Sequence, residues 1–193
     1  MSAYIKKGFT LIELLIVMAI LGVLAIVVLV AINPVQQLAR TRDSGRKSTV
    51  TQIGHSLEAY FTSHGGQYLN EANCTDAASP MESWMTCLQV AGELASVPGA
   101  ITYSSGGLPC TLAAGVIGNA QNSICYVVNS TSDQAIVYAT LESASETSKC
   151  PTANPYEYYV WSTVDGRGGL ICLTNAADRP GPGSQAANWS AIQ

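Results

Sequence analysis

The fold of this chain is decided near its start by the stretch Lys6-Lys7-Gly8-Phe9-Thr10-Leu11-Ile12-Glu13-Leu14-Leu15-Ile16-Val17. Two lysines and a glycine precede an apolar run at residues 9–32, in which Glu13 is the only ionisable side chain. An apolar run of more than about 18 residues is typical of a membrane-spanning helix. At about 1.5 Å per residue this run reaches roughly 36 Å, which exceeds the thickness of the hydrocarbon core. Because a carboxylate inside such a helix is costly, we expect Glu13 to have a function and a partner.

The segment Gly8-Phe9-Thr10-Leu11-Ile12-Glu13 resembles the processing site of type IV prepilins and the related pseudopilins. In that family a membrane peptidase cuts after the glycine and methylates the new N-terminal amine. The resemblance implies that Gly8 is the last leader residue, that Phe9 becomes the methylated first residue, and that Glu13 helps to recruit each subunit to a filament. It is close over residues 6–31 and looser to about residue 68, so the remaining chain is interpreted from its own residues.

Electrostatics supports these roles for Phe9 and Glu13. Cleavage after Gly8 leaves a cationic amine on Phe9 at the membrane boundary, and Glu13 of the same or a neighbouring chain can pair with it. Pairing removes an isolated charge from a medium of low dielectric constant, where such a charge is expensive. The alternatives are an ordinary single-pass anchor or a secretory signal peptide, but a signal peptide has an apolar region of only about 7–15 residues.

The sequence predicts a leader, a long helix and a head. Residues 1–8 form the prepilin leader, whose Lys6 and Lys7 favour a cytoplasmic N-terminus. Residues 9–63 form one long N-terminal helix, of which 9–32 are the transmembrane segment and filament core. Pro34 is expected to kink or loosen this helix. The head covers residues 64–193, with a connecting loop at 64–99 and an antiparallel sheet with a C-terminal loop at 100–193.

Composition and cysteine usage place the head in an oxidising compartment. Charged residues make up 11% of the 193 residues, and the formal net charge of −4 argues against a chain whose whole surface binds nucleic acid. An even number of cysteines, all after the apolar run and without Cys-x-x-Cys spacing, predicts disulfides. Sequential pairs are favoured among about 15 connectivities. The pairs are Cys74–Cys87, Cys110–Cys125 and Cys150–Cys172.

Four basic side chains cluster just beyond the apolar run, at Arg40, Arg42, Arg46 and Lys47, with Asp43 among them. One interpretation is a patch that contacts DNA. The interpretation that we favour is pairing with acidic groups of neighbouring subunits, together with local pairing from Asp43 to Arg46 and Lys47.

In the head, the pattern predicts a short helix at residues 81–95 and then strands. Residues 101–103 are a short candidate strand, and residues 109–118 resemble a loop. Residues 124–128 and 135–139 form one predicted hairpin, and residues 156–161 and 170–173 form a second. The predicted fold class is α+β and type IV pilin-like: a long helix packed on the inner face of an antiparallel sheet of about four strands, with disulfides stabilising the head.

The sequence lacks the motifs that are typical of catalytic, metal-binding and phosphate-binding sites. We find no phosphate-binding glycine loop, no His-Glu-x-x-His and no nucleophile elbow, so no catalytic residue, metal site or cofactor is expected. An aromatic cluster on the predicted strand at residues 156–161 could bind a sugar or carry charge, although strands favour such residues anyway. The cluster consists of Tyr156, Tyr158, Tyr159 and Trp161.

The lack of a catalytic motif predicts a structural function, and the resemblance implies which one: a type IV pilus subunit that serves adhesion, motility or DNA uptake. The expected partners are many copies of the chain, the prepilin peptidase and methylase, and the assembly machinery of the inner membrane. The chain is expected to be anchored in the inner membrane before assembly and to lie in an extracellular pilus afterwards. The alternatives are a pseudopilin of type II secretion, a minor pilin that binds DNA or a surface, and a plain membrane-anchored domain.

Processing is the first testable expectation, because Lys6, Lys7 and Gly8 stand in register with Glu13. The mature chain should begin at Phe9 and carry one added methyl group. Intact mass and N-terminal fragmentation of the chain isolated from membranes measure both changes. A chain that still begins at Met1, or one cut beyond residue 32, would contradict the pilin interpretation.

Overall fold

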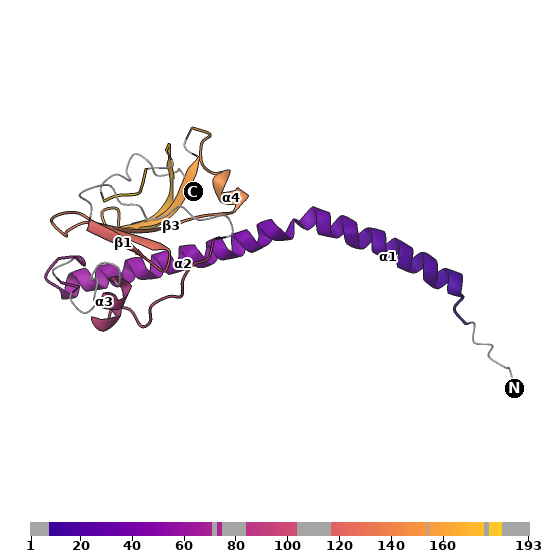
Figure 1. Cartoon of the computed structure of the whole chain (residues 1–193), viewed down its shortest axis with the longest axis horizontal. Coiled ribbons are helices and arrows are strands. Elements are labelled where there is room, and N and C mark those ends of the chain that lie inside the picture. Colours follow the sequence, from indigo (N-terminus) through magenta and orange to yellow (C-terminus); the bar gives the residue numbers. More distant parts are fainter. Residues whose placement is uncertain are drawn as a thin grey trace. The chain divides into compact units, whose positions relative to one another are not determined.

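The computed structural model describes residues 8–70, 73–74, 84–103, 117–153, 155–175 and 178–182. The chain divides into two compact units, Met1–Leu38 and Ala39–Gln193, which are taken in turn. The elements confirm the predicted α+β class, with a long N-terminal helix and an antiparallel sheet (Figure 1).

Helix α1 (Leu11–Ile32) begins at a capping box. Thr10, in an extended conformation, accepts a hydrogen bond from the Glu13 N–H through Oγ1 (3.3 Å), while Glu13 Oε2 accepts one from the Thr10 N–H (2.9 Å). Two of the amide groups that a helix start leaves without partners are thereby satisfied. No α1 side chain is buried, so its apolar surface is open on every side.

The long helix is interrupted at one residue, Asn33, which adopts a left-handed conformation (φ 45°, ψ 77°). Helix α2 (Pro34–Ser63) starts directly after it. The proline ring lacks an N–H and disfavours a right-handed helical conformation at the residue before it. Asparagine tolerates the left-handed region better than most residues, so the predicted loosening near Pro34 takes the form of a single-residue break.

The head contains five strands: β1 (Ile117–Gln121), β2 (Ile124–Val128), β3 (Ala135–Thr140), β4 (Tyr156–Ser162) and β5 (Arg167–Leu173). Each pairs antiparallel with the next, so the spatial order is β1-β2-β3-β4-β5. The four strands of the two predicted hairpins are present. The candidate strand at residues 101–103 was wrong because those residues are not in a strand. Strand β1 was not predicted, and it begins at residue 117, near the end of the stretch at 109–118 that resembled a loop.

One face of the sheet packs on α2, as predicted (Figure 1). Val50, Ile53, Leu57 and Tyr60 form the apolar stripe of the helix, and all are buried. They share a core with alternate residues of β2 and β3 and with Trp161 of β4. The apolar residues at the helical period of α2 and the alternate residues of the strands therefore form one apolar layer.

The opposite face of the sheet is buried too, which the prediction of a single inner face did not include. Its core contains Val127, Ile136, Tyr138 and Tyr158. Arg179 donates a hydrogen bond to the Tyr158 hydroxyl (3.3 Å), and Pro180 is buried, so part of the C-terminal segment lies against this face. Strands β2 and β3 consequently have no exposed side chain.

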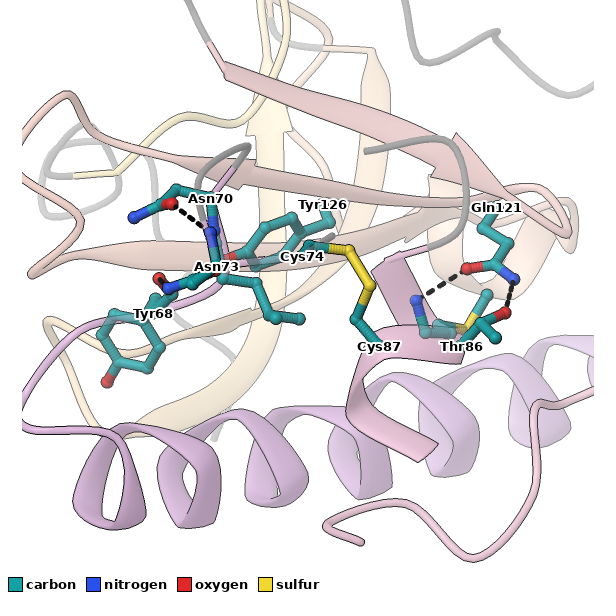
Figure 2. Close-up of a disulfide and its surroundings, with 10 residues drawn as sticks. Tyr68, Asn70, Asn73, Cys74, Thr86, Cys87, Gln121 and Tyr126 are labelled. Carbon is teal, nitrogen blue, oxygen red and sulfur yellow. Dashed lines mark hydrogen bonds between the residues drawn. A yellow bond between two sulfur atoms is a disulfide. The ribbon is translucent and has the colours of Figure 1, made fainter. Parts of the chain in front are cut away.

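Helix α3 (Trp84–Val90) is shorter than predicted, since residues 91–95 are not helical and residues 81–83 lie outside the described part of the chain. Figure 2 shows the disulfide from Cys87 of α3 to Cys74, whose Cα atoms are 5.6 Å apart. Gln121 of β1 accepts a hydrogen bond from the Met85 N–H (2.6 Å) and donates one to Thr86 (3.1 Å). Together these contacts fix α3 beside the end of β1.

A second disulfide joins Cys150 to Cys172 of β5, so two of the predicted sequential pairs are present in the structure. Cys125 is also disulfide-bonded. Cys110, its predicted partner, lies outside the described residues. Helix α4 (Ala144–Thr147) is a single turn between β3 and Cys150.

The packing of α2 on the sheet depends on a glycine. A Cβ atom added at Gly54 would lie 2.1 Å from Cγ of Trp161. We expect Gly54→Ala to destabilise the head by at least about 1 kcal/mol, because the cost of overpacking exceeds the gain in helix propensity of about 1 kcal/mol.

The same helix offers a matched control for that substitution. Gly45 has no atom within 4 Å of an added Cβ, so Gly45→Ala should raise stability by up to about 1 kcal/mol. Urea unfolding of the full chain in detergent, followed by tryptophan fluorescence, measures both variants. If both variants gain the same stability, the position of Trp161 does not depend on the missing Cβ atom at Gly54.

Candidate functional site

The N-terminal segment brings Thr10 and Glu13 together. Besides the capping box, the Thr10 hydroxyl donates a hydrogen bond to Glu13 Oε2 (2.6 Å). Both bonds from Thr10 therefore reach the same carboxylate oxygen. This geometry holds the negative charge of Glu13 at the helix N-terminus, where the helix dipole favours it.

Gly8 and Phe9 are accessible. No atom lies within 4 Å of a Cβ added at Gly8, and the Phe9 side chain is 76% exposed. A peptidase can therefore approach the Gly8–Phe9 bond. The Phe9 nitrogen is one residue from Thr10, whose own N–H donates a hydrogen bond to Glu13, so this nitrogen lies close along the chain to the carboxylate.

Thr10 is the residue of this segment whose role the sequence reasoning missed. The signal was present, because Thr10-Leu11-Ile12-Glu13 has the Ser/Thr-x-x-Glu spacing of a capping box before an apolar run. Thr10 is needed to orient Glu13, although the resemblance pointed to the glutamate alone.

Helix α1 provides the apolar surface of the site. Among the described residues, one helical stretch, beginning at Leu11, is long and apolar enough to cross a membrane by length and composition. The 22 residues of α1 extend about 33 Å, close to the thickness of the hydrocarbon core.

In the head, the basic cluster of α2 contacts acidic residues of its own chain. The Arg46 guanidinium is 2% exposed and contacts both Asp43 (2.7 Å) and Glu142. Arg42 contacts the other oxygen of Glu142 (2.9 Å). We refer to Arg42, Asp43, Arg46 and Glu142 as the head clamp, because it joins α2 to the chain that follows β3.

Further contacts satisfy most polar groups of the head clamp, although the buried Nε of Arg46 has no hydrogen-bond partner in the described structure. The Asp43 carboxylate accepts hydrogen bonds from the backbone N–H groups of Glu142 (3.0 Å) and Ser143 (2.8 Å). Arg46 donates to the Thr102 carbonyl (3.2 Å) and lies over the Tyr103 ring, 4.1 Å from its centroid. A buried ion pair is favourable only when hydrogen bonds satisfy its remaining groups, and these contacts do so for Asp43.

The next residue of α2 after Arg46, Lys47, forms an ion pair of its own. Its Nζ lies 2.7 Å from Glu146 of α4, which Lys149 also contacts (3.0 Å). Burial acts to raise the pKa of Glu146, but the hydrogen bonds from Lys47 and Lys149 outweigh burial and lower that pKa below its usual range. The resulting stabilisation is present above the ordinary pKa of a glutamate and is lost as the pH falls through the lowered value.

These contacts correct the expectation that the basic cluster pairs with neighbouring subunits. Arg42, Arg46 and Lys47 pair within the chain, while the predicted local pair from Asp43 to Arg46 is present. Because Arg46 is buried, it is not available to a phosphate group. Arg40 alone of the four basic residues has an exposed side chain without an ion pair in the described structure.

The aromatic cluster of β4 serves the core rather than a single surface. Tyr158 and Trp161 are buried on opposite faces of the sheet. Tyr159 is partly exposed and lines an open groove of about 680 Å³ along α2, where its hydroxyl lies 3.1 Å from Thr51 Oγ1. Within the described residues, no group of three or more His, Cys, Asp and Glu side chains could hold a metal ion.

Comparison with protein families identifies the N-terminal segment. Residues 5–29 match the family described as the prokaryotic N-terminal methylation motif.

The chain carries this methylation motif.

The motif is consistent with the type IV pilin and pseudopilin family, and it indicates a structural protein that is processed by prepilin peptidase. The match ends at residue 29, so it does not describe the head. Neither the curated proteins nor the solved structures contain a match to the chain.

The head clamp can be tested by removing one charge. Glu142→Gln leaves the buried Arg46 with Asp43 as its remaining carboxylate, and we expect a loss of about 3 kcal/mol in the free energy of unfolding. The measurement is the urea midpoint of the full chain in detergent. Lys149→Gln is the control, with an expected loss below about 1 kcal/mol, because Lys149 is partly exposed and Glu146 keeps Lys47. Equal losses would mean that the head clamp is no stronger than a surface pair.

Proposed function

We propose that this chain is the structural subunit of a type IV pilus. Prepilin peptidase cleaves it after Gly8 and methylates Phe9, and the mature chain polymerises through α1 into an extracellular filament. The observation that carries this proposal is the methylation motif at residues 5–29, placed at the start of a helix whose apolar surface is open on every side. Such a filament serves adhesion, motility or DNA uptake.

The exposed apolar surface of α1 would lie in an apolar environment both before and after assembly. Before assembly the helix spans the inner membrane, with Lys6 and Lys7 on the cytoplasmic side. After assembly, the same surface is buried among the α1 helices of other copies. The contact joins two different surfaces of the subunit. It therefore does not form a closed dimer but adds subunits along a filament.

Glu13 supplies the specific contact in this assembly. Its carboxylate is held at the N-terminus of α1 by Thr10, and the Phe9 amine of the same or an incoming copy pairs with it. In an apolar filament core each of these charges would be costly without the other. The pairing therefore selects one axial position for each new subunit among the many that a uniformly apolar helix would allow.

A second candidate is a pseudopilin of a type II secretion system. The methylation motif is consistent with this candidate as well, because both kinds of protein carry it. A pseudopilin would use the same cleavage and the same helix contacts in a short filament that stays within the cell envelope. Imaging of the cell surface, with mass spectrometry of the sheared filaments, separates the two candidates.

Substitution of Glu13 tests the assembly mechanism. Glutamine also completes a capping box, so Glu13→Gln keeps the helix start and removes only the charge. An unpaired buried charge costs on the order of 3–5 kcal/mol, and each 1.4 kcal/mol is about tenfold in an association constant. We therefore expect the ratio of sheared surface filament to processed membrane subunit to fall at least tenfold, with cleavage after Gly8 unchanged.

Thr10→Ser is the matched control, because serine retains the cap and leaves the Glu13 charge in place. This variant should give the wild-type ratio of sheared surface filament to processed membrane subunit. If Glu13→Gln and Glu13→Ala also assemble at that ratio, Glu13 is not an assembly contact.

A further inference from the structure

The head has an open groove of about 680 Å³ along one side of α2, which we call the α2 groove. Its lining on the helix extends from Lys47 to Ala59, which is about 18 Å at 1.5 Å per residue. Tyr159 of β4 and Glu93, which follows α3, also line it. Clefts of about 300–1,000 Å³ are typical of small-molecule sites in proteins, so the α2 groove is large enough to be one.

Polar side chains form most of the lining of the α2 groove. Ser48, Gln52 and His55 lie four and three residues apart, so they share one face of the helix. All three are exposed, and within the described residues none of their side chains makes a hydrogen bond. Among the described residues that line the groove, none is a leucine, isoleucine, valine, methionine or phenylalanine. The lining therefore suits a ligand with many hydroxyl groups and does not suit an apolar helix.

Tyr159 adds a flat ring whose position is fixed. Its hydroxyl oxygen lies 3.1 Å from Thr51 Oγ1, and a Cβ atom added at Gly168 of β5 would lie 2.7 Å from the same oxygen. The tip of the ring is thus held between α2 and the backbone of β5. A tyrosine offers a large and rigid contact area at a low cost in conformational entropy. Because Tyr159 is partly exposed, its ring can contact the C–H groups of a ligand in the groove.

The two charged side chains of the α2 groove have opposite signs. Lys47 already pairs with Glu146 (2.7 Å). Glu93 accepts a hydrogen bond from Ser63 (2.8 Å), and no cation in the described structure neutralises its charge. An anionic ligand would therefore meet Glu93, and a cationic ligand would meet Lys47. The groove consequently favours a ligand without net charge.

We propose that the α2 groove binds a neutral oligosaccharide. The hydroxyl groups of the sugar exchange hydrogen bonds with Ser48, Gln52 and His55, and the C–H face of one sugar ring packs against Tyr159. A sugar ring combines such a face with a rim of uncharged hydroxyl groups, which is the combination that the lining offers. This binding goes beyond the function proposed above, because a single subunit can bind the sugar without polymerising.

A titration followed by saturation-transfer NMR tests the proposal on the full chain. The chain is kept in lauryldimethylamine oxide, because maltoside detergents carry a sugar of their own. The neutral probes are cellotetraose, maltotetraose, mannotetraose and chitotetraose, with tetragalacturonate as the acidic probe and tetraserine as the peptide probe. We expect at least one neutral probe to bind with a dissociation constant of about 1 mM or lower. Absence of binding by all four neutral probes, or tighter binding of the acidic or peptide probe, overturns the proposal.

Substitutions on α2 locate the binding site. Gln52→Ala combined with His55→Ala removes two exposed hydrogen-bonding groups, and we expect the affinity for the neutral probe to fall about tenfold. The control combines Gln37→Ala with Thr41→Ala, which change exposed side chains of α2 outside the groove and should keep the wild-type affinity. The urea midpoint of each variant verifies that the head is folded. Wild-type affinity of the groove variant, or an equal loss in the control, overturns the proposal.

Substitutions of Tyr159 test the ring contact separately. Tyr159→Phe keeps the flat ring and should bind the neutral probe within about twofold of wild type, whereas Tyr159→Leu keeps apolar volume without the ring and should bind about tenfold more weakly. Wild-type affinity of the leucine variant would contradict the packing of the sugar on Tyr159. A chain that binds a neutral probe but never forms filaments would overturn the function proposed above and leave this site standing.

Discussion

Helix α1 exposes every one of its large apolar side chains in the described structure. At about 25 cal/mol for each Å² of apolar surface, a surface of this kind strongly favours a lipid or protein environment over water. The chain must therefore keep α1 in a membrane or among similar helices throughout its existence.

The head, in contrast, buries its apolar side chains within its own fold. Both faces of its sheet are buried, and α2 contributes the largest apolar stripe to one of them. The head clamp adds ionic contacts between α2 and the residues after β3, which lie about a hundred positions further along the chain. Three of the four basic side chains of α2 therefore already have acidic partners within the chain.

The sequence was sufficient for features that depend on local periodicity. The apolar run, the stripe on α2 and the two hairpins of alternating or β-branched residues all appear in the structure. Strand β1 could not be recognised, because Ile-Gly-Asn-Ala-Gln lacks a β-branched pattern. It pairs with β2 along its whole length, and a tight turn joins the two strands. The turn residues Asn122 and Ser123 both have positive φ (52° and 66°), and asparagine followed by serine is a weaker hairpin signal than asparagine followed by glycine.

In the candidate site, the capping partnership of Thr10 with Glu13 could be read from the sequence, since the two residues are one helical turn apart. The pair from Asp43 to Arg46 is also local and was expected. The pairing of Arg46 with Glu142 was not accessible, because a separation of 96 residues is bridged only by the folded sheet. Charge alone identified a basic cluster but not which acidic residues would meet it.

Burial of the head clamp also decides how the molecule responds to the ionic strength around it. Dissolved salt screens exposed charges over about 8 Å at physiological concentration and screens buried charges much less. Side chains of Asp43 and Arg46 are 3% and 2% exposed, so few counterions can approach them. The contacts between α2 and the residues after β3 should therefore change little in strength between dilute and concentrated salt solutions.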